Sequence, residues 1–190
     1  MTEKKLQVFV SSTFTDLREE RQAAVEAILS AGHIPAGMEL FTAGDQSQMS
    51  VIKRWIDDSD VYLLLQGGRY GSIELDSGKS YTHLEYEYAI SKGMPFFAVV
   101  ISENALNEKT KLRGLGVVEL GDSKKLEEFR KIVLTKLVKF WDDKKDIKIA
   151  IHETLNEFSL RKDLVGWLRG DKSSRHWDSS RAISKINKGE

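Results

Sequence analysis

Short apolar runs alternate with helical patterns along the first part of the chain. The runs of strand length cover residues 6–11, 33–38, 61–66 and 96–101. Between them, apolar residues recur every three or four positions, as in amphipathic helices, over residues 16–31, 47–57 and 81–92. The run VYLLLQ at 61–66 is continuously apolar, which is typical of a strand buried on both faces, whereas Pro35 and Gly37 weaken the second run. This alternation predicts a parallel sheet with helices on both sides.

The second half of the chain follows a less regular pattern. Residues 104–122 are predicted to form a long polar connection, 124–134 a helix and 136–141 a fifth strand at the edge of the sheet. Residues 147–168 are predicted to form one or two helices. We therefore expect a single α/β domain over residues 1–171 with a helical C-terminal part, followed by a loose polar tail over residues 172–190.

Composition narrows the functional classes. The chain of 190 residues suits one domain, and 29 Lys and Arg balance 29 Asp and Glu, so no excess positive charge is present to hold a nucleic acid. The absence of cysteine excludes disulfides, thiolate metal sites and a cysteine nucleophile. The sequence contains no secretory signal and no apolar run long enough to span a membrane. We expect a cytoplasmic protein, or a soluble module of a larger one, that binds neither nucleic acid nor membrane.

The standard cofactor and metal motifs are absent from the sequence. No phosphate-binding GxxxxGK[ST] motif occurs, and GGRYGS at 67–72 does not match GxGxxG. The four histidines stand far apart, without the spacing of metal ligands. We therefore expect neither a metal nor a resident cofactor.

Two segments lie where open α/β sheets bind ligands, directly after predicted strands. After the third strand, Arg69 offers a planar donor fork for phosphate or carboxylate, and Tyr70 offers a stacking face. A plain turn with an exposed arginine and a packed tyrosine explains these residues equally well. After the first strand, Ser11, Ser12 and Thr13 form either a ligand cradle or, more simply, a turn with capping hydroxyls.

The helix that follows the first strand opens with charged residues. Asp16 and Glu19 have the spacing of a capping box. Glu20 and Arg21 are interpreted as part of a solvated face.

The stretch SYTHLEYEYA at 80–89 carries the main catalytic candidate. In a helix, Glu85 shares a face with Tyr81 and Ala89, whereas Glu87 lies about 200° further round the axis. A carboxylate beside aromatic side chains at the mouth of a parallel sheet can stabilise the oxocarbenium-like transition state of glycosidic cleavage. Thr82 and Glu85 also have the spacing of a capping box, and spacing alone favours that structural role.

Several of these segments together resemble a TIR-like family long described as a domain of unknown function. The shared motifs are VFVSSTFTDLREER, ME at 38–39, SDVYLLLQGGRYGS, SYTHLEYEYAISKGMP and VGWLRGD, spread over residues 6–171. The resemblance implies a flavodoxin-like, doubly wound five-stranded parallel sheet of order 2-1-3-4-5, related to TIR domains and nucleoside 2-deoxyribosyltransferases. In the latter, a helix-borne Glu acts on an N-glycosidic bond, and EYEYAISKGMP is similar to that pattern, with Glu85 ahead of Ala89, Gly93 and Pro95.

The resemblance also implies a function and a site. Glu85 would stabilise positive charge on the ribose as nicotinamide leaves NAD, which would be a substrate and not a cofactor. The phosphates would lie near Arg69 and residues 11–13, and the nicotinamide would stack near Phe14, Tyr70 or Tyr81. We expect Ser11, Phe14, Arg69, Tyr70 and Glu85 around one cleft at the carboxyl edge of the sheet.

The implied biological role is that of an effector in immune signalling of the anti-phage type. Family members often stand at the N-terminus of STAND- or NACHT-type ATPases, which implies homo-oligomers on activation. Two alternatives stay open at this point. One is a non-catalytic module for self-association or nucleotide sensing, and the other is hydrolysis or transfer on a free nucleoside or nucleotide.

Overall fold

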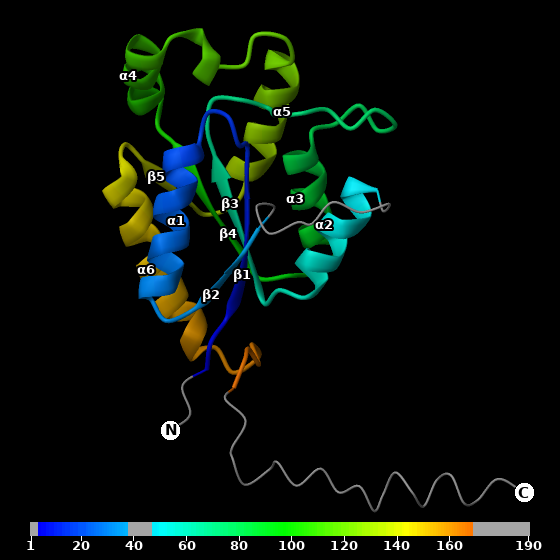
Figure 1. Ribbon diagram of the computed structural model, residues 1–190, viewed down its shortest axis with the longest axis vertical. Helices are drawn as coiled ribbons and strands as arrows, with labels where there is room; N and C mark the ends of the chain where they lie inside the picture. The colour runs from blue at the N-terminus through cyan, green and yellow to red at the C-terminus, as the bar shows by residue number, and fades with distance from the viewer. Residues whose placement is uncertain (1–3, 38–46, 169–190) are drawn as a thin grey trace, which may run out of the picture.

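A five-stranded parallel sheet forms the centre of the protein in the computed structural model, which describes residues 4–37 and 47–168 (Figure 1). The strand order is β2-β1-β3-β4-β5, and every neighbouring pair is parallel. The strands are β1 Gln7–Ser12, β2 Ile34–Ala36, β3 Val61–Gln66, β4 Phe96–Ile101 and β5 Val138–Trp141. This order confirms the predicted doubly wound, flavodoxin-like architecture.

Six α-helices accompany the strands within the described residues; five lie between strands, and α6 follows β5. They are α1 Arg18–Ser30, α2 Gln48–Asp57, α3 Tyr81–Ser91, α4 Glu103–Arg113, α5 Ser123–Leu134 and α6 Lys144–Leu160. Helices α1 and α6 cover one face of the sheet, while α2, α3 and α5 cover the other, as Figure 1 shows. A short 3-10 turn, η2 Leu115–Val117, follows α4.

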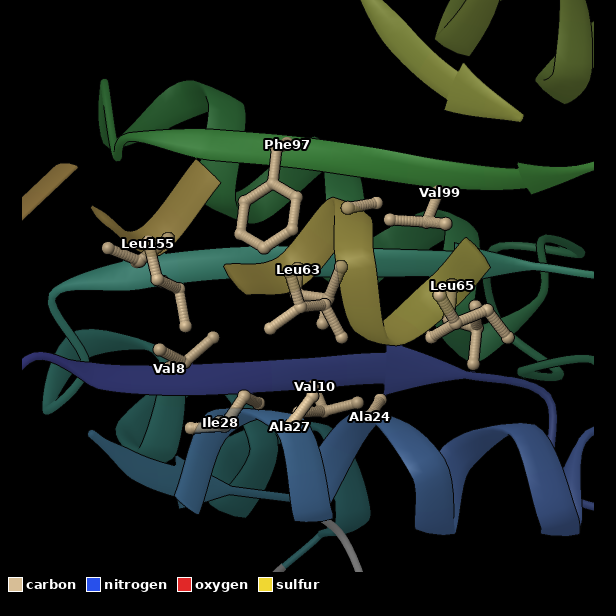
Figure 2. Packing of buried hydrophobic residues seen from close by; sticks show 14 of the residues in the cluster. Val8, Val10, Ala24, Ala27, Ile28, Leu63, Leu65, Phe97, Val99 and Leu155 are labelled. Atoms are coloured by element: carbon tan, nitrogen blue, oxygen red, sulfur yellow. The ribbon is translucent and has the colours of Figure 1, made fainter. Parts of the chain in front are cut away.

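The two faces of the sheet bury separate apolar clusters, because successive side chains of a strand point to opposite sides. On one face, Val10 and Leu63 pack against the alanine-rich side of α1, formed by Ala24 and Ala27 (Figure 2). On the other face, Phe9, Tyr62 and Leu64 pack under α2, α3 and α5. Complete burial of a Leu or Val side chain stabilises the fold by roughly 1.5–3 kcal/mol, so this alternation fixes the register of the central strands.

The second half of the chain differs from the sequence prediction at two places. The polar connection expected over 104–122 is wrong, since α4 begins at Glu103, where the Ser102 hydroxyl accepts a hydrogen bond from the Ala105 N–H at 3.1 Å. Helix α4 buries none of its residues completely, so it lacks the apolar stripe that reveals a helix in sequence. The helical segment predicted over 147–168 is one helix, α6. It begins at Lys144, three residues before the predicted start, because Asp143 forms a capping box there.

Both ends of the described chain meet at the amino edge of the sheet. The Lys5 N–H donates to the Trp167 carbonyl at 2.9 Å, and the Trp167 N–H donates back at 2.6 Å. The Lys4 ammonium adds hydrogen bonds to the carbonyls of Arg161 and Leu164, at 2.7 and 2.8 Å. Residues 38–39 of the ME motif and the tail over 172–190 lie outside the described residues.

Candidate functional site

The central polar contact at the carboxyl edge of the sheet joins Ser11 on β1 to Glu85 on α3. The Ser11 hydroxyl donates a hydrogen bond to the Glu85 carboxylate. The exposed fractions of the two residues are only 1% and 2%. Ser11 reaches α3 because strand alternation points it to the same side of the sheet as Phe9.

The capping-box interpretation of Glu85 is wrong. Helix α3 begins after Ser80, whose hydroxyl accepts a hydrogen bond from the His83 N–H at 3.2 Å. Thr82 therefore lies inside the helix, and Glu85 lies a full turn beyond its start. The capping box expected at Asp16 and Glu19 is also wrong, since Leu17 precedes α1 without a side-chain cap.

Burial changes the acid strength of Glu85. Removal from water raises its pKa from 4.5 to about 7, and the Ser11 hydrogen bond and the positive charge of Arg21 oppose part of this rise. Burial of an ionisable carboxyl group costs stability, and acids with strongly shifted pKa values cluster at functional sites. Glu85 can therefore stabilise positive charge or transfer a proton at physiological pH.

Tyr62 on β3 is the aromatic neighbour of Glu85 that the sequence analysis missed. Burial, and next the charge of Glu85, raise the pKa of Tyr62 well above its ordinary value, so its phenol stays neutral. Its ring lies 5.9 Å from that of Phe9 and 6.4 Å from that of Tyr86. The alternation of side chains along β3 could have revealed this neighbour, because it places Tyr62 and Leu64 on the same side of the strand.

Arg21 is a second residue that the sequence analysis misplaced. The expected solvated face at Glu20 and Arg21 is wrong, because both side chains are buried. The Arg21 guanidinium donates to the Ser12 hydroxyl at 2.9 Å and lowers the pKa of Glu85 by its charge. Successive side chains of a strand alternate, so Ser12 lies on the opposite side of β1 from Ser11. It accepts a hydrogen bond from the Arg21 guanidinium, whose positive charge acts on Glu85.

Three further buried polar side chains lie where β1 and β3 end. Within the described part of the chain, no hydrogen bond of good geometry reaches the Thr13 hydroxyl, the Asp16 carboxylate or the Gln66 amide. Burial raises the pKa of Asp16, and the nearby Thr13 hydroxyl opposes part of that rise. Polar groups that stay unpaired in a protein interior are candidates for contact with a ligand or an ordered water.

The loop after β3 divides into an open and a buried part. Among the described residues, Arg69 makes two long hydrogen bonds, at 3.4 Å to the Thr15 hydroxyl and 3.3 Å to the Gly116 carbonyl. Tyr70 is buried, and its hydroxyl hydrogen-bonds to His83 Nδ1 at 2.8 Å. Because its ring packs against His83 and Phe129, Tyr70 presents no free face for stacking in this structure.

The other two aromatic candidates differ in exposure. Phe14 is 56% exposed, and the Arg18 guanidinium lies 4.9 Å from its ring centre. Tyr81, the first residue of α3, is partly buried against the cluster under that helix. Phe14 thus offers an open aromatic surface at this edge of the sheet.

The predicted site residues share one edge of the sheet and differ in depth. Ser11 and Glu85 form a buried pair, Arg69 lies over the loops and Tyr70 lies in the core. A small cavity of about 130 Å³ lies between α1 and β2, lined partly by Val10 and Arg21, and neither Ser11 nor Glu85 lines it. Ligand sites generally enclose roughly 300–1,000 Å³, so this cavity is too small for a nucleotide.

Neither a metal site nor a membrane-crossing helix is found in the part of the chain that the structure describes. Across residues 4–37 and 47–168, no three His, Asp or Glu side chains are grouped to hold an ion. Over the same ranges, none of the helices combines the length and the apolar character that crossing a membrane requires.

The strand order and the buried acid define a flavodoxin-like α/β domain with a glutamate under the carboxyl edge of its sheet. Residues 7–156 match the family model DUF4062, described as a domain of unknown function, and the chain belongs to this family. Among proteins with curated descriptions, none matches the chain.

Three solved structures show a distant similarity to this chain. The CMP N-glycosidase BcmB of Clostridium botulinum is similar over 80% of this chain and 98% of its own, with 13% identity and a TM-score of 0.43. The TIR domains of the activated Roq1 resistosome, which directly recognises the pathogen effector XopQ, are similar over 97% and 98%, with 15% identity and a TM-score of 0.43. A diflavin flavoprotein A3 from Nostoc is similar over 86% and 98%, with 13% identity and a TM-score of 0.39. At these levels, similarity carries no conclusion about activity.

Proposed function

We propose that this domain is a TIR-like enzyme that hydrolyses the N-glycosidic bond of NAD or a related nucleotide, with Glu85 as its catalytic residue. The observation that carries the proposal is the buried Ser11–Glu85 pair, in which burial raises the pKa of the acid to about 7. The pair lies at the carboxyl edge of the sheet, where open α/β sheets generally bind ligands. Ser80 caps helix α3, so Glu85 is not needed for that structural role.

The proposed reaction breaks the bond between the ribose anomeric carbon and the nicotinamide nitrogen. The bonding pair leaves with that nitrogen, so nicotinamide departs neutral and positive charge develops on the ribose. The ionised Glu85 carboxylate stabilises this charge, and a water then adds to the anomeric carbon and releases a proton. The products are nicotinamide, ADP-ribose and one proton, which balances the hydrolysis.

Ser11 and Arg21 are the positioning residues in this proposal. The Ser11 hydrogen bond fixes one carboxylate oxygen, and the Arg21 charge favours the ionised form. Both effects lower the pKa of Glu85, which burial alone would raise further. They increase the fraction of the protein that carries the reactive anion at pH 7.

The biological role that we propose is a cytoplasmic effector of immune, anti-phage type signalling that forms homo-oligomers when active. A STAND- or NACHT-type ATPase module is the proposed partner. The support for this role is the family resemblance in the motifs at 6–21 and 80–95.

The test is to incubate concentrated protein, free and assembled on an oligomeric scaffold, with NAD, a nucleoside monophosphate and a free nucleoside. Release of nicotinamide or of a nucleobase is followed by chromatography. Turnover of NAD supports the proposal. If only the other two compounds are cleaved, the substrate is a nucleotide or nucleoside and not NAD. If neither form releases any base, the enzymatic proposal is rejected in favour of the alternative, a non-catalytic module for self-association or nucleotide sensing.

A further inference from the structure

The Ser11–Glu85 pair is closed off from solvent, although it lies at the edge of the sheet where ligands generally bind. The exposed fractions of the two residues are 1% and 2%. In an open α/β sheet, the loops that follow the strands build this edge. A substrate can therefore meet Glu85 only if one of these loops moves, and the contacts of the loop after β3 place it over the pair.

Gly71 of that loop lies between the loop after β1 and the first turn of α3. A Cβ on Gly71 would lie 3.0 Å from Thr13 Cγ2 and 3.7 Å from Thr82 Oγ1. Thr13 follows Ser11 by two residues, while Thr82 precedes Glu85 by three and shares its face of α3. Because β1 runs toward the carboxyl edge and α3 runs back toward the start of the parallel strand β4, both threonines lie nearer to this edge than the pair does. Gly71 thus closes the layer above Ser11 and Glu85.

The closed position of this loop requires a glycine. The φ angle of Gly71 is +98°, a conformation that L side chains rarely adopt. An added methyl group would also press on the side chain of Thr13. Since residue 71 has no side chain that could turn aside, uncovering Glu85 at this point requires a movement of the loop backbone.

Tyr70 holds the loop beside Gly71. Its hydroxyl forms a hydrogen bond of 2.8 Å with His83 Nδ1 on α3, and its backbone N–H donates to the Glu119 carboxylate at 3.0 Å. The base of the loop is fixed separately, because the Gly68 carbonyl accepts from the Glu119 N–H at 2.8 Å. The closed position therefore depends on the Tyr70 hydroxyl at one side of Gly71, and the loss of that contact favours opening.

We propose that residues 69–72 form a lid over the Ser11–Glu85 site, in which Gly71 closes the opening and Tyr70 is the anchor. The closed lid separates Glu85 from solvent, and its opening admits a substrate. Access to the acid then depends on the fraction of molecules in which the lid is open. The role in admitting a substrate rests on the proposed function, whereas the lid itself rests on the contacts of residues 69–72.

Amidation of carboxyl groups tests the lid without any substrate. Carbodiimide and glycinamide modify carboxyl groups that reach solvent, and peptide mass spectrometry gives the rate at each residue. In the parent, Glu85 should react slowly, whereas Glu87, which is 44% exposed on the same helix, should react fast. Glu20 is the reference for global unfolding, because its side chain is only 8% exposed and is paired with Lys109 beneath α4.

Gly71→Ala should hold the lid open. Amidation of Glu85 should become about tenfold faster or more, because overpacking and an unfavourable φ both weaken the closed state. Glu20 should stay protected. Gly78→Ala is the matched control, since Gly78 also has a positive φ, +68°, but its added Cβ would meet no described atom within 4 Å apart from those of its chain neighbours. It should leave the rate at Glu85 unchanged.

Tyr70→Phe is the second lid variant, since it keeps the ring and removes only the hydroxyl anchor. Amidation of Glu85 should become about fivefold faster, as the loss of one hydrogen bond of the closed state allows. Tyr88→Phe is its control, because it removes a hydroxyl of α3 that donates to the exposed Asp57 at 2.8 Å, away from the lid.

The proposal is overturned if Glu85 reacts as slowly in both lid variants as in the parent, or if it already reacts in the parent like an exposed carboxyl group. If Gly71→Ala does not fold, or if Glu20 also becomes reactive in it, Tyr70→Phe decides alone. Cleavage of NAD is measured separately. A lid that opens in a protein that releases no base would reject the proposed function and support the lid.

Discussion

Ser11 donates a hydrogen bond to Glu85 although 74 residues separate them in the sequence. The contact ties the end of β1 to the second turn of α3 and places an ionisable group inside the protein. Its hydroxyl partner lowers the pKa of the acid, while burial raises it, and burial is the larger effect. Acid strength, stability and the proposed catalysis are therefore coupled through one pair of side chains.

Glu85→Gln preserves the shape of the side chain and an oxygen that accepts from Ser11, but it removes the negative charge. We expect release of nicotinamide to fall about 100-fold or more, the usual effect of losing one electrostatic stabiliser of a transition state. Initial rates from chromatography measure this effect.

Glu87→Gln is the control for that substitution. The Glu87 side chain is 44% exposed and pairs with Lys79 at 2.6 Å, so it points away from the buried pair. Turnover should stay within a few-fold of the parent. Full activity in Glu85→Gln would assign the cleavage to another residue.

The stability of the parent should depend on pH more strongly than that of Glu85→Gln. The pKa of Glu85 is raised from 4.5 to about 7 by folding, so the unfolded chain loses this proton first. The stability that the protonated group provides is complete below pH 4.5 and is lost as the pH rises to 7. The difference in unfolding free energy between the two proteins should change by about 3 kcal/mol over this window, since one pKa unit is worth about 1.4 kcal/mol. Urea unfolding across the window measures it, and two parallel curves would contradict the burial of an acid at this position.

Turnover should rise as the pH passes through about 7, because the proposed mechanism uses the ionised form of Glu85. The pH dependence of kcat/KM reports this ionisation in the free enzyme. A rate that falls over the same range would indicate that the protonated acid is the active form.

Ser11→Ala should move that profile to higher pH. The Ser11 hydrogen bond lowers the pKa of Glu85, so its removal raises the pKa and reduces the ionised fraction at neutral pH. The rate at high pH should recover much more than the rate at pH 7. An equal loss at every pH would mean that Ser11 acts on the substrate and not on the acid.

Gly67→Ala should destabilise the protein because Gly67 packs directly on the loop after β1. A Cβ at this position would lie 2.6 Å from the Asp16 carboxylate and 2.9 Å from the Leu17 side chain. Overpacking of this kind costs about 1–3 kcal/mol of unfolding free energy. Gly116→Ala is the control, since its added Cβ would meet no described atom within 4 Å apart from those of its chain neighbours. Equal unfolding midpoints for the two variants would show that the loop after β1 accommodates the added Cβ without loss of stability.

The central strands were predictable because burial on both faces leaves an unambiguous pattern. β3 and β4 begin and end where their apolar runs do, and the strand order follows from the alternation together with the family resemblance. Helix α4 was not predictable in this way, since a surface helix that buries no residue completely shows no periodic stripe.

Glu85 was identified from the sequence, but its surroundings were not. Helical spacing gives the direction of a side chain around the axis and says nothing of its depth in the fold. Arg21 was misread for a related reason: the charged sequence LREER is typical of a solvated face. Burial of Arg21 depends on contacts such as the one with Ser12, nine residues earlier in the chain.

The pairing of Lys5 with Trp167 determines how the domain would respond to a mechanical load. Tension applied between the two ends of the described chain would act first on this antiparallel bridge and on the Lys4 contacts beside it. These bonds lie at the amino edge of the sheet, so they would open one after another while β1 stays clamped between β2 and β3. The Ser11–Glu85 pair at the far end of β1 lies outside this force path, and the acid would keep its environment while the domain is held under tension.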